Sequence, residues 1–339
     1  MPVLLFPFRE WNHQLMARAI GLLSGGLDSI LAVRLLADQD VEVLAVSFVT
    51  PFFGSERAER AAAALGVPFR AVDITEPHLE MVKHPKHGYG RNMNPCVDCH
   101  ALMLRTAGGL MEAEGYDFLF TGEVLGERPK SQNRTALDVV ARESGYPDLV
   151  LRPLSAKLLP ETRPERDGLV DRERLLDIQG RSRKRQMALA ETYGITDYPT
   201  PAGGCLLTDP GYSRRLRELL ARCPDAPADD VRLLAVGRHL RLAQDTKLVL
   251  GRNQAENEKL EGLLRPGDVK LLVRGFPGPT GLLRGPADQE LRRLAGAICA
   301  RYSDAPAGEE VPVHFFTGDA EEELSVVPAA PETIEPLLI

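Results

Sequence analysis

A glycine-rich turn between an apolar segment and a helical pattern is the feature that most constrains this fold. Residues 19–23 form a buried-strand pattern, residues 24–29 read Ser-Gly-Gly-Leu-Asp-Ser, and an apolar helical pattern follows over residues 30–36. Glycines let backbone N–H groups approach an anion closely, and the positive end of the following helix points at the same place. The sequence therefore predicts a phosphate-binding loop, with a plain turn as the alternative. The Gly-Lys-Ser/Thr ending of a Walker loop is missing.

Strand and helix patterns alternate over roughly the first two hundred residues. Strands are predicted over residues 19–23, 41–48, 69–72, 118–121 and 150–154. Helices are predicted over residues 30–36, 56–65 and 174–193. This alternation predicts an α/β fold with a doubly wound parallel sheet and right-handed crossovers. The charged, proline-containing stretch 158–177 predicts a linker or an exposed excursion.

The pattern changes after Pro210, where short strands and turns dominate. Short strands are predicted over residues 231–236, 248–251, 269–273 and 281–283. We therefore expect an N-terminal segment over residues 1–18, an α/β domain over 19–210 and a smaller α+β domain over 211–339. The acidic, proline-rich tail over residues 304–339 is expected to pack only in part.

The composition is typical of a protein from a reducing cytosol. The chain has 339 residues, a formal net charge of −7 and five cysteines. In such a compartment a Cys-x-x-Cys pair is more often metal-binding or catalytic than a structural disulfide. The apolar runs are shorter than a membrane span requires. We expect a cytoplasmic protein with no membrane partner, and the acidic balance still permits RNA binding through a local basic patch.

The motif over residues 24–29 resembles the PP-loop of ATP pyrophosphatases. These enzymes cleave ATP between its α and β phosphates and adenylate a substrate oxygen, so the resemblance implies ATP and Mg²⁺. Residues 48–57, 121–132 and 151–154 are similar to segments of tRNA 4-thiouridine synthetases. The implied nucleotide-site residues are Ser24, Gly25, Gly26, Asp28, Ser29, Phe48, Thr121 and Gly122, with Asp28 beside the metal.

Three cysteines predict the place of sulfur transfer. Cys96 and Cys99 form a Cys-x-x-Cys pair after Asn94-Pro95, and Cys205 follows two glycines. The set resembles that of iron–sulfur-dependent tRNA thiolation enzymes, which implies that these three thiolates hold a [4Fe–4S] cluster with one open iron, beside the nucleotide. The alternatives are a persulfide and resolving pair, Cys96 and Cys205, a zinc site completed by His100, and purely structural cysteines.

The remaining cysteines and the histidines carry weaker predictions. Cys223 and Cys299 have apolar helical neighbours and are expected to be buried small side chains. Histidines crowd the approach to Cys96, and exposed loop positions are favoured over a metal site for His78, His84, His87 and His100.

A basic cluster and a second resemblance provide candidates for RNA contact. Residues 236–242 and 250–259 resemble the RNA-binding module of NFACT proteins, over about residues 230–300. Cationic groups on one helix face would neutralise phosphates, with a solvated face as the alternative. The proposed RNA contacts are Arg181, Arg183, Lys184 and Arg185.

These resemblances together predict an ATP-dependent tRNA sulfurtransferase that forms AMP. The enzyme would adenylate a uridine carbonyl oxygen and replace it by sulfur, with Asp28, Cys96, Cys99 and Cys205 as catalytic residues. Its expected partners are tRNA and a sulfur donor, either sulfide or a cysteine desulfurase, and a homodimer is left open. The alternatives are a sulfurtransferase acting on a small molecule or carrier protein, and an RNA-binding module that senses a nucleotide without catalysis.

Overall fold

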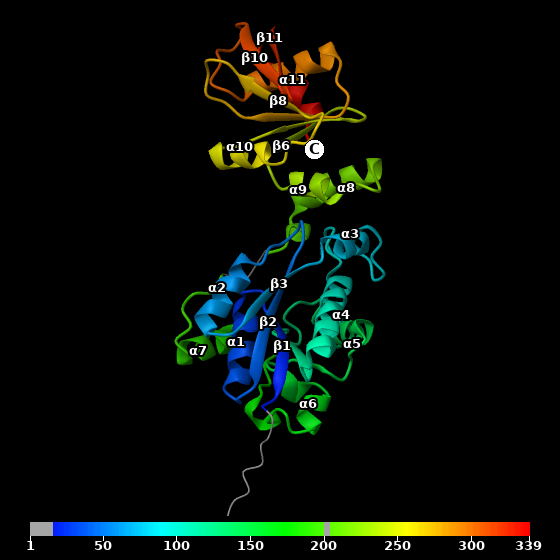
Figure 1. Cartoon of the computed structure of the whole chain (residues 1–339), viewed down its shortest axis with the longest axis vertical. Helices are drawn as coiled ribbons and strands as arrows, with labels where there is room; N and C mark the ends of the chain where they lie inside the picture. The colour runs from blue at the N-terminus through cyan, green and yellow to red at the C-terminus, as the bar shows by residue number, and fades with distance from the viewer. Residues whose placement is uncertain (1–15, 200–203) are drawn as a thin grey trace, which may run out of the picture. The chain divides into compact units, whose positions relative to one another are not determined.

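The computed structural model describes residues 16–199 and 204–339. Most of the predicted N-terminal segment, and residues 200–203 of the turn before Cys205, lie outside the described residues. The chain forms two compact units (Figure 1). The first comprises Met1–Thr50, Gly54–Gly90 and Pro95–Ala202, and the second comprises Pro51–Phe53, Arg91–Asn94 and Gly203–Ile339. The predicted domain boundaries, 19–210 and 211–339, stay a prediction.

The first unit is built on a five-stranded parallel sheet. Its strands are β1 (Arg18–Leu22), β2 (Glu42–Val49), β3 (Phe69–Asp73), β4 (Phe118–Thr121) and β5 (Val150–Leu151), in the order β3-β2-β1-β4-β5. The strand β1 is central, and Leu22 pairs with Val46 on one side and Thr121 on the other. The predicted parallel α/β fold is confirmed. The last strand is shorter than predicted because a turn begins at Arg152, whose carbonyl accepts from the Ser155 N–H.

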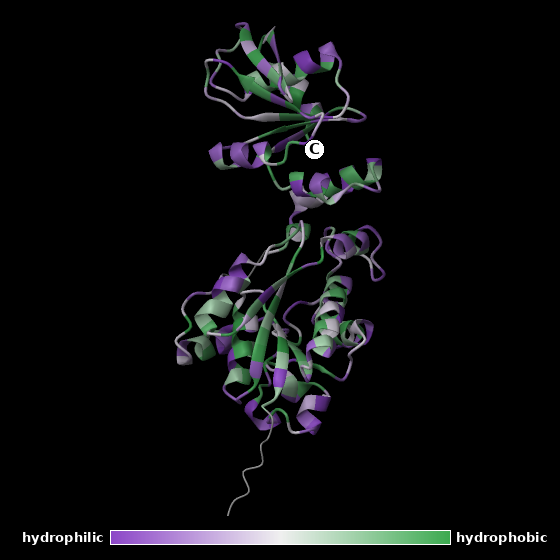
Figure 2. Cartoon of the chain, viewed as in Figure 1, coloured by the Kyte–Doolittle hydropathy of each residue, from purple (hydrophilic) through white to green (hydrophobic). Residues whose placement is uncertain are grey.

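Helices cover both faces of this sheet. They are α1 (Leu27–Ala37), α2 (Glu56–Leu65), α3 (Thr75–Lys83), α4 (Cys96–Glu114), α5 (Arg134–Ser144), α6 (Arg163–Arg166) and α7 (Lys184–Thr192). Figure 1 shows α1, α2 and α7 on one side of the sheet and α4 and α5 on the other. Hydropathic colouring follows this layering, because the strands of the sheet are mostly hydrophobic and the outer helix faces are mostly hydrophilic (Figure 2).

Two predictions for residues 158–193 are wrong. The stretch predicted as an exposed excursion packs against the sheet, because Val170 and Leu175 are buried members of the first unit's core. The helix predicted over residues 174–193 forms only at Lys184–Thr192. The residues just before Lys184 are not helical, and their backbone bonds another segment, since the Gly180 N–H donates to the Leu125 carbonyl. Gly180 also has φ +83°, which a right-handed helix cannot contain.

The second unit contains a six-stranded antiparallel sheet with the order β11-β10-β8-β9-β7-β6. Its strands are β6 (Arg238–Ala243), β7 (Thr246–Leu250), β8 (Val269–Val273), β9 (Gly281–Arg284), β10 (Val311–Thr317) and β11 (Ala320–Val326). Its helices are α8 (Pro210–Arg222), α9 (Ala228–Leu233), α10 (Gln254–Glu261), α11 (Gln289–Arg301) and α12 (Pro331–Ile334). The predicted α+β class of the smaller, C-terminal domain is thus confirmed.

Each face of the second sheet has its own hydrophobic core. On one face Leu248 packs in a core with Ile298 and Cys299 of α11. On the other face Val249 packs with Leu233 of α9 and Leu260 of α10. Because side chains alternate along a strand, Lys247 lies on the face of Val249, opposite to α11. The prediction that Cys299 is buried is confirmed.

Three further predictions for this unit are wrong. The acidic tail was predicted to pack only in part, but it packs into the core. Alternating apolar residues of β10, Val313 and Phe315 among them, are members of that core. Residues 231–236 do not form a strand, because Pro227 and the acidic first turn of α9 favour a helix start. Cys223 is exposed at the end of α8 instead of buried. No helix in the described part of the chain is both long and apolar enough to cross a bilayer.

Candidate active site

The glycine-rich loop joins β1 to α1 in a compact turn. Gly25 has φ +73°, and a Cβ there would lie 2.7 Å from the backbone of Arg57. The Ser29 hydroxyl donates to the Gly26 carbonyl at 2.8 Å. Gly26 occupies the N-cap position of α1 and has no side chain that could cap the helix. The first N–H groups of the helix are therefore available to bind an anion in front of the loop.

The other predicted nucleotide residues lie at the same edge of the sheet. Gly122 directly follows β4, and a Cβ there would be 2.4 Å from the backbone N of Ser29. Thr121 ends β4 and Phe48 lies near the carboxyl end of β2, both buried. The carboxyl ends of neighbouring parallel strands form the usual ligand crevice of an open α/β sheet. The structure thus brings together the loop, Thr121 and Gly122 where a nucleotide is expected.

A ring of unsatisfied polar groups surrounds this loop. Among the described residues, Asp28 Oδ1, Glu127 Oε2 and Arg183 Nε are buried without a hydrogen-bond partner, and the buried Gln186 amide lies beside Asp28 and lowers its pKa. Buried polar groups in native structures are almost always paired, so such a concentration indicates an absent polar ligand. Glu127 and Gln186 were not predicted. The only sequence signal was the position of Glu127 inside the motif over residues 121–132.

The charges of this ring suit a metal-bound polyphosphate. Burial raises the pKa of Asp28, and the nearby Arg183 guanidinium opposes that rise. Burial also raises the pKa of Glu127, and the charge of Asp28 raises it further, so the two carboxylates repel each other. A Mg²⁺ ion takes carboxylate and phosphate oxygens as ligands and would remove this repulsion. The residues therefore fit Mg²⁺ and a nucleotide.

The predicted basic cluster is divided in the structure. Arg183 is half-buried and acts on Asp28, so it belongs to the loop. Arg185 forms an ion pair with Asp177 at 2.6 Å. Arg181 and Lys184 are exposed. RNA contact by these four residues stays a prediction.

Two of the three predicted cysteines share the first turn of α4. The helix begins at Cys96, and the Cys99 N–H donates to the Pro95 carbonyl at 2.9 Å. His78 of α3 is fully buried, and its Nε2 lies 3.2 Å from Cys99 Sγ. Burial lowers the pKa of His78 to about 4. The prediction of an exposed loop histidine is therefore wrong for His78, which is a neutral neighbour of Cys99.

A buried carboxylate fixes this turn of α4 at the edge of the sheet. Glu123 accepts from Arg152 Nε at 3.0 Å and from Thr121 Oγ1 at 3.0 Å, and its Oε1 lies 2.8 Å from His100 Nδ1. Burial alone would raise the pKa of Glu123, but Arg152 and His100 hold it at about 2. His100 is thus positioned by a carboxylate instead of lying in an exposed loop. Because Glu123 follows Gly122, the thiol-bearing turn lies at the same edge as the phosphate loop.

Cys205 belongs to the second unit. It precedes the 3-10 turn Leu206–Thr208, where the Leu206 N–H donates to the Phe52 carbonyl at 3.1 Å. Asn92 Nδ2 donates to the Thr208 carbonyl at 2.6 Å, and Asn92 lies only a few residues before Cys96 in the chain. The predicted convergence of all three cysteines stays a prediction. Within residues 16–199 and 204–339, no three His, Cys, Asp or Glu side chains gather as a metal-binding group.

The fold and the loop define the first unit as a nucleotide-binding domain of the PP-loop class. Residues 15–157 match the family model of the thiamine biosynthesis protein ThiI. Residues 237–337 match the family model of the NFACT protein RNA binding domain. The first unit is therefore similar to the ThiI family and the second unit to the NFACT RNA binding domain.

Individual proteins and structures are similar to parts of this chain. The tRNA-specific 2-thiouridylase MnmA of Symbiobacterium thermophilum is 25% identical over 253 residues, which cover 66% of this chain and 61% of that protein. The MnmA of Nitratidesulfovibrio vulgaris is 37% identical over 94 residues, covering 24% of this chain and 27% of that protein. The chain thus spans less than two thirds of these relatives. A solved 4-thiouridine synthetase–RNA complex with bound ATP aligns over 40% of this chain and 36% of that one, with 25% identity and a TM-score of 0.34.

Proposed function

We propose that this chain is an ATP-dependent tRNA sulfurtransferase that replaces a uridine carbonyl oxygen by sulfur and releases AMP and pyrophosphate. One observation carries the proposal. The bond between His100 and Glu123 holds the turn with Cys96 and Cys99 at the sheet edge where the phosphate loop lies. An activating site and thiols at one edge are what a thiolation reaction requires.

The first half of the reaction is adenylation. The loop N–H groups would hold the phosphates, and the uridine oxygen would attack the α-phosphorus as pyrophosphate leaves. Arg183, beside Asp28, would offset negative charge on the departing pyrophosphate. Asp28 and Glu127 would hold Mg²⁺, which when bound neutralises phosphate charge. The product is an AMP ester, whose oxygen leaves far more readily than the original carbonyl oxygen.

The second half is sulfur delivery by thiols on α4. Cys96 and Cys99 both lie in the first turn of α4. Cys96 and Cys99 fit two positions of a [4Fe–4S] site because both are thiol donors one helical turn apart, and Cys205 would be the third ligand. When bound, the cluster would supply sulfide as the nucleophile. His78 packs against Cys99 and would keep that thiol oriented.

A persulfide route is the competing account of the same step. The terminal sulfur of a persulfide on Cys96 or Cys205 would attack the activated carbon and expel AMP. The second cysteine would then attack the remaining sulfur link, release the thiolated base and leave a disulfide between the two cysteines. Cys99 has no covalent role in that route, which makes it the residue that distinguishes the two accounts. The sulfur donor, sulfide or a cysteine desulfurase, and a homodimer stay predictions.

The decisive experiment compares tRNA nucleosides by mass spectrometry. A strain that lacks the gene should lose one thiolated uridine, and the wild-type gene should restore it. Asp28→Asn should fail to restore it, whereas Cys223→Ser, which removes an exposed cysteine of the second unit, should restore it fully. An unchanged set of thionucleosides in the deletion strain would refute tRNA thiolation and favour a small-molecule substrate or a nucleotide sensor.

A second measurement separates the two sulfur routes. Protein purified without oxygen should show iron–sulfur absorption, and Cys99→Ser should lose both the absorption and the thiolation. Absence of iron, with Cys99→Ser still active, would replace the cluster by the persulfide route.

A further inference from the structure

Gln186 carries a fully buried amide that the proposed mechanism does not use. It lies in the first turn of α7, and 0% of its surface is exposed. The same face of α7 continues one turn later with Ala190, which packs in one core with Leu31 and Leu35 of α1. A buried amide costs free energy unless it lies beside a polar group, so its neighbour indicates what it does.

Two contacts fix how α7 lies along α1. Before α7 begins, the Gly180 N–H donates to the Leu125 carbonyl at 2.7 Å, and Leu125 follows shortly after the carboxyl end of β4. Just after α7 ends, the ring of Tyr193 lies under the Arg34 guanidinium of α1, which is 5.4 Å from the ring centroid. The chain thus enters α7 at the carboxyl edge of the sheet, where α1 also begins, and both helices run in the same direction.

This arrangement places Gln186 opposite Asp28 of the phosphate loop. Gln186 precedes Tyr193 by seven residues, and Asp28 precedes Arg34 by six. At the rise of an α-helix both lie about 10 Å back from the contact between Arg34 and Tyr193. The Gln186 amide accordingly lies beside the Asp28 carboxylate and lowers its pKa. The packing of two helices therefore brings a neutral polar group to a carboxylate of the proposed metal site.

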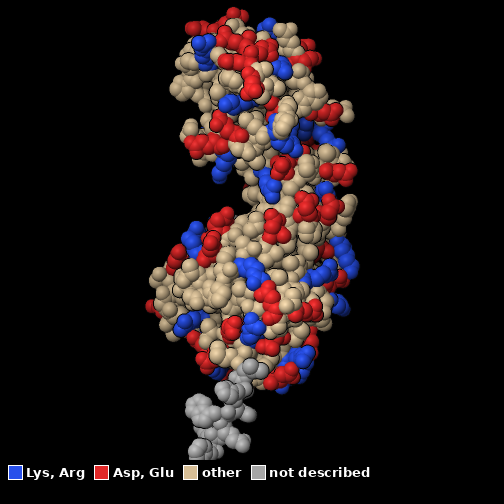
Figure 3. Space-filling model, viewed as in Figure 1, with Lys and Arg blue, Asp and Glu red and all other residues tan. Residues whose placement is uncertain are grey.

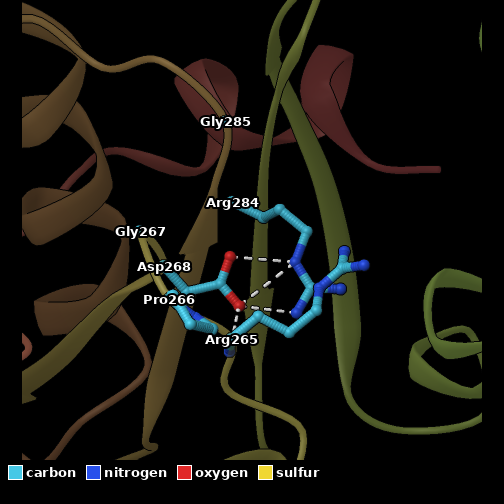
Figure 4. Close-up of a pocket in the computed structure, with 6 residues that line it drawn as sticks. All are labelled: Arg265, Pro266, Gly267, Asp268, Arg284 and Gly285. Atoms are coloured by element: carbon cyan, nitrogen blue, oxygen red, sulfur yellow. Dashed lines mark hydrogen bonds and ion pairs between the residues drawn. The ribbon is translucent and has the colours of Figure 1, made fainter.

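A neutral amide can hold a carboxylate without cancelling its charge. In the described part of the chain, Asp28 Oδ1 is buried without a hydrogen-bond partner, so this oxygen stays available to a cation. A buried carboxylate of the second unit is held differently. Asp268, 7% exposed, lines a pocket of about 480 Å³ and accepts bonds on both oxygens from the Arg284 guanidinium (Figure 4). The charge of Asp268 is thus cancelled inside the protein, whereas Asp28 keeps an oxygen for a ligand.

Carboxylates at the surface need no such arrangement. Acidic side chains gather over β10 and β11 (Figure 3), and one of them, the exposed Glu323, pairs with Arg274 at 3.1 Å. Asp28 is instead enclosed near a second carboxylate, Glu127, whose Oε2 is likewise buried without a partner among the described residues. Carboxylate oxygens left over in this way are the ligands that Mg²⁺ takes.

We propose that Gln186 is a positioning residue, which fixes the Asp28 carboxylate in the orientation that binds the metal ion of the nucleotide. The inference rests on the proposed nucleotide site, but it does not depend on which substrate receives sulfur. Because the amide is uncharged, it holds Asp28 without competing with Mg²⁺ for the carboxylate. An apolar side chain at this position would leave the carboxylate free to turn away from the metal, since partners of metal ligands set the orientation of those ligands.

The test measures ATP binding to the full chain by calorimetry, without tRNA, over a range of Mg²⁺ concentrations. Gln186→Met keeps the length of the side chain and removes the amide, and it should raise the Mg²⁺ concentration for half-maximal ATP binding about tenfold. In an Asp28→Asn background the same substitution should change this concentration by less than about twofold, because the carboxylate through which Gln186 acts is gone. Met187→Gln is the matched control, since Met187 is exposed on the same helix, and it should behave as wild type.

Melting temperatures give a second readout that does not depend on ATP. Gln186→Glu adds a carboxylate beside Asp28, so it should lower the melting temperature when no metal is present. Mg²⁺ alone should then raise the melting temperature of this variant by more than that of wild type. This measurement also decides the question if Asp28→Asn abolishes ATP binding. Gln186→Met should melt at or above the wild-type temperature, which checks that it is folded.

Three outcomes would overturn the proposal. An unchanged Mg²⁺ requirement in Gln186→Met, or an equal rise in both backgrounds, would show that Gln186 does not act through Asp28. Equal stabilisation of wild type and Gln186→Glu by Mg²⁺ would separate residue 186 from the metal site. A wild-type chain that binds no ATP would refute the nucleotide site and this inference together. Normal ATP binding with no thionucleoside lost in the deletion strain would refute only the thiolation of tRNA.

Discussion

Replacing Lys247 by methionine tests what it costs to bury this lysine, which is only 6% exposed, in the second unit. Burial, with Arg241 as the next cause, lowers the pKa of Lys247 from 10.5 to about 8. One pKa unit corresponds to about 1.4 kcal/mol, so the charged lysine reduces the stability of the folded state by about 3 kcal/mol at pH 7. Methionine keeps an unbranched apolar stem without the charge. We therefore expect Lys247→Met to raise the free energy of unfolding by up to about 3 kcal/mol.

The size of this gain should depend on pH in a defined direction. The folded state binds fewer protons at Lys247 than the unfolded state does between about pH 8 and 10.5, so wild-type stability rises with pH through that range. Methionine does not titrate. The advantage of the variant should therefore fall from about 3 kcal/mol at pH 7 to about 2 kcal/mol at pH 9.

Native-state hydrogen exchange of the amides in β6, β7 and β9 is the appropriate assay. It reports the free energy of opening for that part of the second unit, without requiring the whole chain to unfold in one step. Arg293→Met, an exposed change on α11, should alter the same amides by less than about 0.5 kcal/mol. No gain at pH 7, or a gain that stays constant up to pH 9, would refute the conclusion that Lys247 is buried in its charged form.

Three further predictions concern the first unit. Gly122→Ala should weaken ATP binding at least about tenfold in calorimetry, because the new Cβ would meet the Ser29 backbone N at 2.4 Å; an unchanged Kd would contradict the close packing of the loop. Glu127→Gln should leave melting unchanged or raised, yet weaken the Mg²⁺ dependence of ATP binding, and an identical Mg²⁺ titration would remove Glu127 from the metal site. Arg152→Met should cost about 3–5 kcal/mol at pH 7 in urea unfolding, because it leaves Glu123 buried and charged. Since Arg152 and His100 hold the pKa of Glu123 at about 2, the stability from this carboxylate is present above its ordinary pKa of 4.5, and the loss in the variant should shrink as pH falls below that value.

Local patterns predicted the elements that depend on neighbouring residues. The helix over residues 56–65 and the strands over 118–121 and 269–273 occur where the sequence placed them. Failures came where distant contacts decided the outcome. Residues 174–183 have a helical composition, but the backbone at Gly180 bonds Leu125 instead. The tail became two strands because its alternating apolar residues found a sheet edge to extend.

The sequence of residues 24–29 was sufficient to predict a phosphate loop after a strand, because such a loop depends on glycines and on the helix that follows directly. It also marked Cys96 and Cys99 as a pair, since three residues make nearly one helical turn. Only the tertiary structure showed that Glu127 and Gln186 share a buried space with Asp28, and that Lys247 lies among arginines. Burial and charge repulsion arise between side chains that are distant along the chain, and no local pattern reports which of them will be enclosed together.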